Sequence, residues 1–388
     1  MMNATYDDFK KALSGDSSSK LILDLKAFHQ NMDWVLKNAG DKKIRIATKS
    51  IRSSEILKKI LNHSPLFQGL MTFTLEESLW LRDLGFKDIL LGYPSVDTIQ
   101  LEKLALSPQE ITLMTDRPEH LEMLEQIAKK NQSYFSICVD FDLSMDLPGL
   151  RFGVYRSWIH NEKRLHTFLD TLKKCSHLKL EAVMGYEAQI AGVGDLKKPL
   201  IKTLKALSVP QLRKRRAKFL QIIQSYGHNI KIINGGGTGS LNSTNQEQCI
   251  SEITVGSAFY APVLFDYYED FKLKPALFFT SPIVRFPDSG ILTVLGTGHI
   301  ASGELSAIKQ PLPWLPTGLH FLKHEGAGEV QSPLHYSGPL DLKIGDPVIF
   351  RHAKAGEICE RFNHIQVIQD SKIIEKVETY RGMGKSFL

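Results

Sequence analysis

A regular alternation of short apolar runs with helical segments is the feature that most restricts how this 388-residue chain can fold. The runs are rich in Ile, Val, Leu and Phe and are continuous, which is typical of strands covered on both faces. After an opening run at residues 21–25, the sequence predicts eight strands: Ile44–Thr48, Gly69–Phe73, Asp88–Gly92, Ile111–Thr115, Tyr134–Asp140, Leu178–Tyr186, Ile230–Asn234 and Glu252–Gly256.

Eight such strand–helix units have the size of a (β/α)8 TIM barrel. A doubly wound open sheet is the alternative, but it usually has fewer strands and an early GxGxxG fingerprint, and none follows an early strand here. One predicted helix starts with Ser208 as its N-cap, has Pro210 near its first turn and stops at Gly227. Its basic cluster, Arg213 to Arg216, is expected to face solvent.

The pattern changes near residue 275. Beyond it, short β-like runs are split by Gly, Pro and Asp, and no long amphipathic helix is present. We therefore predict the α/β fold class, with a (β/α)8 barrel over residues 21–275 and a mostly β C-terminal domain over residues 276–388. The opening strand fits either domain, and residues 1–20 are expected to form a flexible N-terminal arm.

Charge, cysteine content and hydropathy exclude several classes of protein. The net charge of +6, from 48 basic and 42 acidic residues, is too small to indicate a nucleic-acid or membrane partner. Four separated cysteines with no CxxC pair argue against a disulfide scaffold or a zinc ribbon. No apolar stretch approaches the roughly 20 residues of a membrane span, and the N-terminus lacks an apolar signal core. A cytoplasmic protein is expected.

A lysine follows the first barrel strand, at the end where barrels build their active sites. With a period of two residues, Arg45, Ala47 and Lys49 share one face of this strand, so Lys49 is predicted to point into the barrel mouth. Desolvation lowers the pKa of a buried lysine, as an imine-forming amine requires. The alternative is a lysine that extends to solvent at the rim.

Small residues follow the seventh and eighth strands, as NGGGTGS at residues 234–240 and VGS at residues 255–257. Barrels frequently bind phosphate there, with glycine N–H groups converging on the anion and a hydroxyl from Thr238 or Ser240 beside them. Plain tight turns are the alternative. A lysine facing a phosphate cradle implies a phosphorylated carbonyl compound, and pyridoxal phosphate is the simplest candidate.

These motifs resemble the fold-type III pyridoxal-phosphate enzymes, which have an alanine racemase N-terminal-like barrel. RIATKSIRS, around Lys49, resembles the cofactor-lysine segment of the D-threonine aldolase and D-serine dehydratase branch. GLMTFTLEES, DILLGYPSVD, LRFGV, MGYEAQIAG, NGGGTGS and TVGSAFYAP follow in the order and spacing of that family. Through EGAGEVQSPL, RHAKAGE and TYRGMGK, the chain is most similar to the group called amino acid deaminase/aldolase.

The resemblance implies roles for the matched residues. Lys49 would hold pyridoxal 5'-phosphate as an internal aldimine, a Schiff base, and would then act as the catalytic base. Arg151 would reach the phenolic oxygen of the cofactor, and Tyr186 would line the pocket. His299, in the β domain, is a candidate general acid or base. The phosphate would lie near Gly236, Gly237, Thr238, Gly256, Ser257 and Tyr260. For both tyrosines, core packing is the alternative.

The chain departs from the branch at three positions. Ile51 stands where the branch commonly has a histidine. His352 is followed by Lys354, whose ammonium cannot replace the second metal ligand of the branch. His352 and Cys359 are candidate ligands for a divalent metal, with Glu357 and His364 as alternatives to the cysteine, although the sequence disfavours the presence of a metal. Thr254 replaces the arginine of racemases and the acid of decarboxylases near the pyridine nitrogen.

The resemblance implies a pyridoxal-phosphate-dependent lyase. Its substrate would be a β-hydroxy amino acid, in the D form, and the reaction would be retro-aldol cleavage or deamination. An amino acid racemase is the enzymatic alternative, and a non-catalytic pyridoxal-phosphate-binding protein is the other. The expected partners are a small amino acid and a second copy of the chain in a homodimer, with no nucleic acid and no membrane.

Overall fold

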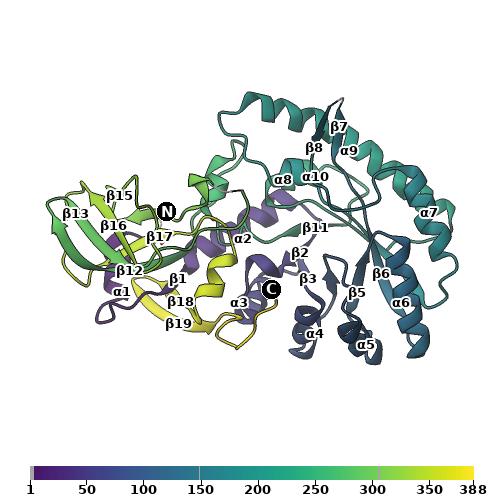
Figure 1. Cartoon of the computed structure of the whole chain (residues 1–388), viewed down its shortest axis with the longest axis horizontal. Coiled ribbons are helices and arrows are strands. Elements are labelled where there is room, and N and C mark those ends of the chain that lie inside the picture. The colour runs from purple at the N-terminus through teal and green to yellow at the C-terminus, as the bar shows by residue number, and fades with distance from the viewer. Residues whose placement is uncertain (1–3, 148, 305) are drawn as a thin grey trace. The chain divides into compact units, whose positions relative to one another are not determined.

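The computed structural model describes residues 4–147, 149–304 and 306–388. They form two compact units, and each unit is made of three separate segments of the chain (Figure 1). One unit comprises residues 35–49, 60–256 and 387–388, and the other comprises residues 1–34, 50–59 and 257–386. The sequence predicted consecutive domains with one boundary near residue 275, whereas the chain passes between the two units several times.

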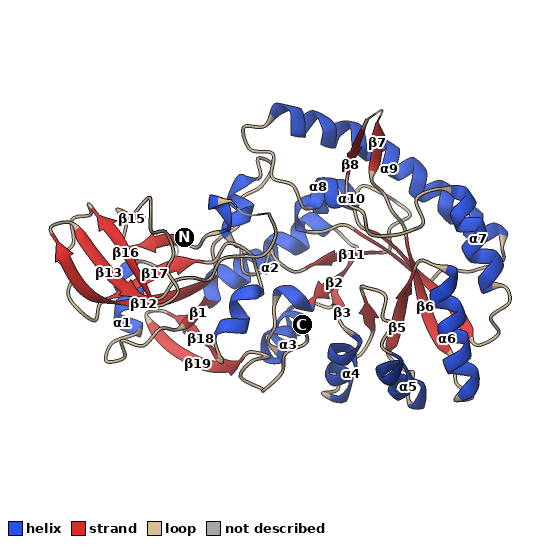
Figure 2. Cartoon of the chain, viewed as in Figure 1, coloured by secondary structure: helices blue, strands red, loops and turns tan. Residues whose placement is uncertain are grey.

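The first unit contains a closed barrel of eight parallel strands, as predicted from the alternation of apolar runs (Figure 2). The closed ring excludes the open doubly wound sheet. Each strand lies within a few residues of its predicted range. The order around the barrel is β10 (Ile232–Gly235), β11 (Glu252–Val255), β2 (Lys43–Ala47), β3 (Phe67–Thr72), β4 (Ile89–Leu91), β5 (Ile111–Thr115), β6 (Phe135–Asp140) and β9 (Leu178–Gly185).

Helices alternate with these strands, and several begin with a polar N-cap. Thr74, Asp97 and Asn161 each accept a hydrogen bond from a backbone N–H group of the first turn. Beyond β6, a short hairpin of β7 (Met145–Leu147) and β8 (Leu150–Phe152) is inserted. The helices are α4 (Leu75–Asp83), α5 (Thr98–Leu106), α6 (Pro118–Lys130), α7 (Glu162–Leu172), α8 (Ala188–Ala191), α9 (Pro199–Ser225) and α10 (Leu241–Asn245).

Helix α9 is ten residues longer at its start than the sequence predicted. It begins at Pro199, and Pro210 lies inside it. Ser208 is buried in mid-helix and accepts a hydrogen bond from the side-chain amide of Gln189 at 2.8 Å, so its hydroxyl does not cap the helix. The Ser-x-Pro start signal was therefore wrong, because tertiary contacts outweigh the loss of one backbone hydrogen bond at a proline.

The amino end of the barrel interior is filled by a fully paired arginine. The Arg45 guanidinium, 0% exposed, donates to both carboxylate oxygens of Glu252, at 2.6 and 2.9 Å. It also donates to Asp88 and to the Leu70 carbonyl. Gly69 (φ +68°) makes room, because a Cβ there would lie 2.5 Å from the guanidinium. Burial alone would lower the Arg45 pKa, but Glu252 and Asp88 raise it.

Apolar side chains occupy the barrel interior beside this ion pair. The five most buried ones come from four strands, β4, β5, β6 and β9, which makes the middle of the barrel a packed core and not a channel. The cluster comprises Leu90, Met114, Cys138, Ala182 and Met184, with Met71 and Ile232 against it. Cys138 is thus a core residue, as its position within a predicted strand indicated.

The second unit is built on a nine-stranded sheet, as the runs beyond residue 275 predicted. The opening strand, β1 (Leu21–Asp24), belongs to it and pairs with β12 and β18. The main path is β15 (Leu319–Phe321), β16 (Gln331–Tyr336), β13 (Ile291–Leu295), β12 (Leu277–Asp288), β1, β18 (His364–Gln369) and β19 (Lys372–Glu378). Strand β17 (Pro347–Arg351) pairs with β12 and with β14 (Leu312–Leu315).

The expected N-terminal arm contains a helix, α1 (Tyr6–Ala12), capped by Thr5. Phe9 in this helix is 1% exposed and contacts Phe278 of β12, so the segment is fixed to the sheet. The remaining helices are α2 (Leu25–Ala39) and α3 (Ser54–His63). Among the described residues, no helix combines the length and the apolar character needed to cross a membrane.

Candidate active site at the carboxyl end of the barrel

Lys49 lies two residues beyond β2, in a 3-10 turn over Thr48–Ser50. Its ammonium donates a hydrogen bond to the Tyr93 hydroxyl at 2.7 Å. The predicted face is confirmed for Arg45 and Ala47, which are buried. Of the two alternatives predicted for Lys49, a buried amine and a lysine that extends to solvent at the rim, the structure has the second, because the side chain is exposed. The chain leaves the strand at Ala47, so the amine is at the rim and open to an incoming ligand.

Two tyrosines extend from Lys49 toward the glycine turn. Tyr93 follows β4 and Tyr186 follows β9, and the two hydroxyls interact electrostatically. Burial, the largest influence, raises the pKa of Tyr186 to about 12, so its hydroxyl keeps its proton at neutral pH. Tyr186 packs directly on the turn, since a Cβ on Gly237 would lie 3.2 Å from its ring. The sequence selected Tyr186 and missed Tyr93, although Tyr93 directly follows a predicted strand.

The Arg156 guanidinium lies over the Tyr186 ring, with Cζ 5.7 Å from the ring centroid. Asp140, the last residue of β6, interacts electrostatically with Arg156. Burial and the neighbouring carboxyl groups of Asp116 and Asp142 raise the Asp140 pKa well above its ordinary value, although Arg156 opposes this. We call Lys49, Tyr93, Asp140, Arg156 and Tyr186 the mouth cluster. Asp140 could have been selected from the sequence, because it is the last residue of a predicted strand.

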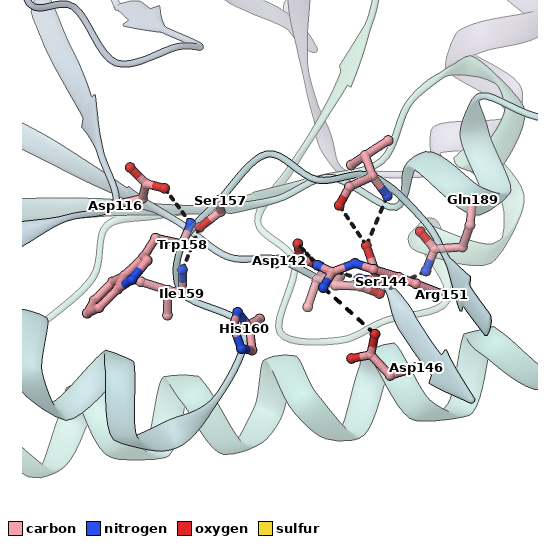
Figure 3. A network of polar contacts seen from close by, with 12 residues as sticks. Asp116, Asp142, Ser144, Asp146, Arg151, Ser157, Trp158, Ile159, His160 and Gln189 are labelled. Atoms are coloured by element: carbon pink, nitrogen blue, oxygen red, sulfur yellow. Dashed lines mark hydrogen bonds and ion pairs between the residues drawn. The ribbon is translucent and has the colours of Figure 1, made fainter. Parts of the chain in front are cut away.

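The loop after β6 presents Arg151 from strand β8 (Figure 3). The Arg151 guanidinium pairs with the buried carboxylate of Asp142 and lies 4.5 Å from the Tyr155 ring centroid. Asp142 also accepts a hydrogen bond from the Ser144 backbone at 2.8 Å. The Arg151 Nε atom is buried and has no hydrogen-bond partner among the described residues. Arg151 is therefore held by a carboxylate and keeps one donor unused.

Two side chains from other parts of the barrel hold this loop in place (Figure 3). Asp116, after β5, accepts a hydrogen bond from the Trp158 backbone at 2.6 Å. The Gln189 amide donates to the Leu143 carbonyl at 2.8 Å. Both anchoring side chains are buried. The loop that carries Arg151 and Arg156 is thus attached to the barrel near each end.

The glycine turn after β10 uses two of its N–H groups within the protein. Gly236 donates to the Glu187 carboxylate at 2.6 Å, and Gly237 donates to the Ser240 hydroxyl at 3.1 Å. The sequence predicted that these N–H groups converge on an anion, and the structure instead pairs both. Gly236 has a φ of +75°, and a Cβ there would lie 2.8 Å from Ile253. Backbone conformation and close packing therefore explain this glycine.

The basic cluster of α9 does not face solvent as a whole, contrary to the prediction. Arg216 is 1% exposed and forms ion pairs with Glu187 and Glu247. Since Glu187 also accepts the Gly236 N–H, Arg216 supports the glycine turn from behind. Arg213 donates to the Ser243 carbonyl in α10, Arg215 donates to the Ser144 carbonyl in the loop after β6, and Lys214 is exposed. The burial of Arg216 could not be predicted from the run of basic residues alone, because its acidic partners lie about thirty residues away in the chain.

Thr254 and Asn234 form a neutral hydrogen-bonded pair in the barrel interior. The Asn234 amide donates to the Thr254 hydroxyl at 2.8 Å and to Glu252 at 2.7 Å. The position where the resemblance expects the arginine of racemases is therefore occupied by an uncharged residue, Thr254. Of the other predicted phosphate-site residues in this unit, Thr238 is 7% exposed and Gly256 is buried directly after β11.

The remaining predicted residues lie in the second unit. The Ser257 hydroxyl is 3.1 Å from that of Ser50. Tyr260 is fully buried and donates to the Ile51 carbonyl at 3.1 Å, and burial followed by Cys359 raises its pKa. The structure therefore gives Tyr260 the role of a core tyrosine.

His299 packs edge-on between two phenylalanines, with its ring centroid 4.9 Å from that of Phe279 and 5.6 Å from that of Phe362. Burial, followed by the positive charge of Arg361, lowers its pKa to about 4. The imidazole is therefore neutral at physiological pH. A neutral imidazole can accept a proton, but it is a poor proton donor, so His299 does not suit the role of general acid.

The candidate metal ligands do not form a metal site. His352 Nδ1 donates to the Leu277 carbonyl, and burial followed by Arg351 lowers its pKa to about 3. Cys359 donates to the Ile51 carbonyl, and burial raises its pKa to about 12, which opposes the thiolate that a metal needs. In residues 4–147, 149–304 and 306–388, no three His, Cys, Asp or Glu side chains gather for a metal. These residues do not fit a divalent ion.

Comparison with known proteins adds a family and a set of similar structures. Residues 23–262 match the family described as alanine racemase, N-terminal domain. No curated protein sequence matched the chain.

Three solved structures illustrate the structural similarity. A D-threonine aldolase from Filomicrobium marinum has a TM-score of 0.79 at 14% identity, over 95% of this chain and 96% of that one. A D-threo-3-hydroxyaspartate dehydratase from Delftia sp. HT23 has a TM-score of 0.77 at 15% identity, over 95% and 98%. An alanine racemase from Bacillus anthracis has a TM-score of 0.67 at 17% identity, over 94% and 98%. At these identities, the likeness concerns the fold.

Proposed function

Since the chain belongs to the alanine racemase N-terminal domain family, whose model covers residues 23–262, we propose that it is a pyridoxal-phosphate-dependent lyase. Its substrate would be a β-hydroxy amino acid, in the D form, and the reaction retro-aldol cleavage or deamination. The observation that carries the proposal is the Lys49 amine. It stands at the carboxyl end of the barrel, hydrogen-bonded to Tyr93 and exposed to a ligand.

The donors at the barrel mouth fit pyridoxal phosphate. The Lys49 amine suits its aldehyde, and the buried Arg151 Nε, which has no partner among the described residues, suits an oxygen of the ring. Because the N–H groups of Gly236 and Gly237 are already paired, the phosphate would rely on other donors of the two small-residue turns, beginning with Thr238 and Gly256. When bound, the cofactor withdraws electrons from the α-carbon of an amino acid through its conjugated ring.

The protein would supply orientation and proton transfer. Tyr93 accepts a hydrogen bond from the Lys49 ammonium and so directs its position at the mouth. Once released, the Lys49 amine has a lone pair with which to take a proton from the substrate. Burial and the neighbouring carboxyl groups of Asp116 and Asp142 raise the pKa of the partly exposed Asp140, so it is the candidate proton donor at this end of the barrel.

Two observations favour a lyase over a racemase. The aldolase and the dehydratase have higher TM-scores, 0.79 and 0.77, than the racemase at 0.67. Thr254 and Asn234 also form a neutral pair where a racemase would have an arginine. Racemisation remains the alternative activity. The nine-stranded sheet of the second unit favours an enzyme over a simple cofactor-binding barrel. A homodimer is part of the same proposal.

Replacement of the lysine tests the proposal. Lys49→Ala is expected to abolish the visible absorbance band of the bound cofactor and to reduce turnover by about 100- to 10,000-fold, because base and cofactor attachment are lost together. Lys43→Ala, at the exposed amino end of the same strand, is the matched control and should change neither.

The assay uses D- and L-forms of serine and threonine. Release of glycine identifies an aldolase, release of ammonia with a keto acid identifies a deaminase, and inversion of the amino acid without release identifies a racemase. A Lys49→Ala protein that kept both the band and the turnover would contradict the proposal.

A further inference from the structure

We propose that Arg156 binds the carboxylate of the amino acid substrate and thereby selects amino acids over amines. This inference rests on the proposed function and adds a substrate-binding residue to it. Arg156 lies in the loop between β8 and α7, on the carboxyl side of the barrel. The resemblance to known enzymes assigned it no role.

The position of Arg156 relative to the amine is given by a chain of contacts within the barrel unit. Its Cζ atom lies 5.7 Å from the Tyr186 ring centroid. Tyr186 interacts with Tyr93, and the Tyr93 hydroxyl is 2.7 Å from the Lys49 ammonium. Arg156 is thus linked to the Lys49 amine through two tyrosines at the same end of the barrel. An amino acid carries its carboxylate on the carbon that bears its amine, so a substrate whose amine reacts at the cofactor needs a cation for its carboxylate at that same end.

The guanidinium of Arg156 is available for a ligand. In the part of the chain that the structure describes, its side chain forms no hydrogen bond and no ion pair, and it is exposed. The neighbouring arginines differ. Arg151 pairs with Asp142, and Arg164 donates to the Trp158 carbonyl at 2.9 Å. Arg156 therefore has its donor fork free where its neighbours use theirs for structure.

Among the described residues, Asp140 forms no ion pair with Arg156. Burial, Asp116 and Asp142 also raise the pKa of Asp140, which opposes its carboxylate form, although Arg156 favours it. The positive charge of Arg156 is thus left for another anion. A planar carboxylate is a good match, because a guanidinium offers two parallel N–H donors to it.

The phosphate of the cofactor is the competing ligand, since Tyr186 also touches the glycine turn. The two possibilities differ in what the loss of Arg156 would weaken. A carboxylate-binding arginine affects the affinity for the amino acid, whereas a phosphate-binding arginine affects the affinity for the cofactor.

The experiment compares two probes that differ by one carboxylate, D-serine and ethanolamine. Each is titrated into the pyridoxal-phosphate-loaded protein, and the shift of the cofactor absorbance gives an apparent Kd. Arg156→Gln is expected to weaken D-serine binding by about 10- to 100-fold, the loss of a charge-assisted hydrogen bond, and to leave ethanolamine unchanged. Arg156→Lys should recover part of the loss, because it restores the charge without the fork.

Arg117→Gln is the matched control. Arg117 also stacks on an aromatic ring, that of Trp158 at 5.6 Å, and its ion-pair partner is the exposed Glu119. It should alter neither titration. An equal change for both probes, no change for D-serine, or a weakened cofactor affinity in Arg156→Gln would overturn the inference. Absence of the cofactor band in the unmodified protein would instead overturn the proposed function.

Discussion

Arg45 at the amino end of the barrel and Arg156 at its carboxyl end differ in how much of their hydrogen-bonding capacity the protein uses. Arg45 is completely buried and donates to Glu252, Asp88 and a carbonyl. Arg156 is exposed, and among the described residues it lies over the Tyr186 ring and influences the Asp140 carboxyl group without an ion pair. The arginine at the amino end therefore stabilises the fold, whereas the arginine at the carboxyl end has hydrogen-bond donors left for a ligand. This agrees with the position of active sites in barrels, which is at the carboxyl end.

The largest effect should follow from breaking the ion pair at the amino end. Arg45→Met leaves the Glu252 carboxylate buried without its partner, and we expect a loss of about 3–5 kcal/mol in the free energy of unfolding. Urea denaturation measures it. The double variant Arg45→Met/Glu252→Leu should recover most of the loss, since no unpaired charge remains. If the double variant were as unstable as the single one, the loss would have to come from packing.

A smaller effect of opposite sign is expected at the carboxyl end. The folded-state pKa of Asp140 is raised above that of an unfolded aspartate, about 3.9. The folded protein therefore binds more protons than the unfolded chain above that pH, and the contribution of Asp140 to stability falls as pH rises toward its folded-state pKa. Asp140→Asn should be more stable than the parent at pH 7, by about 1 kcal/mol, the usual size of a single substitution.

Urea midpoints at pH 4 and pH 7 test this expectation. The two proteins should differ less at the lower pH, because the carboxyl group is then protonated in the folded state and about half protonated in the unfolded one. A variant less stable than the parent at pH 7 would mean that Asp140 is ionised and held by its surroundings. Arg156, Asp116 and Asp142 are the charged groups to examine in that case.

The smallest effect is expected for Arg156→Gln in the absence of substrate. An exposed side chain with no hydrogen bond among the described residues should change the free energy of unfolding by less than about 0.5 kcal/mol. The comparison with Arg45→Met, made on the same barrel by the same denaturation, separates a structural arginine from one reserved for ligands. A loss of several kcal/mol at Arg156 would remove that distinction.

The sequence predicted the barrel well because its strands carry their own pattern. Continuous apolar runs located all eight, and the two-residue period correctly placed Arg45 and Ala47 on the inner face. The period failed at Lys49, because the chain leaves the strand at Ala47 and enters a 3-10 turn. Local patterning thus ends where the strand ends, which is where the candidate site begins.

The residues that prediction missed depend on distant parts of the chain. Arg216 is buried because Glu187 and Glu247 meet it, and neither is visible from the helical pattern around it. The N–H groups of Gly236 and Gly237 are paired within the protein, and the pairing of Gly236 with Glu187 is likewise a contact between distant residues. Tyr93 and Asp140 could have been selected from their strand-end positions, but Arg156 lies in a loop without such a marker.

Helix α9 has a consequence for the evolution and engineering of this barrel. Through Arg213, Arg215 and Arg216 it binds the Ser243 carbonyl, the Asp142 and Ser144 carbonyls, and Glu187 with Glu247. This one helix therefore holds three segments of the chain, which follow strands β6, β9 and β10. We therefore expect that none of these segments can be replaced alone by that of another protein. A replacement made to change substrate preference would also need the part of α9 that contacts the segment.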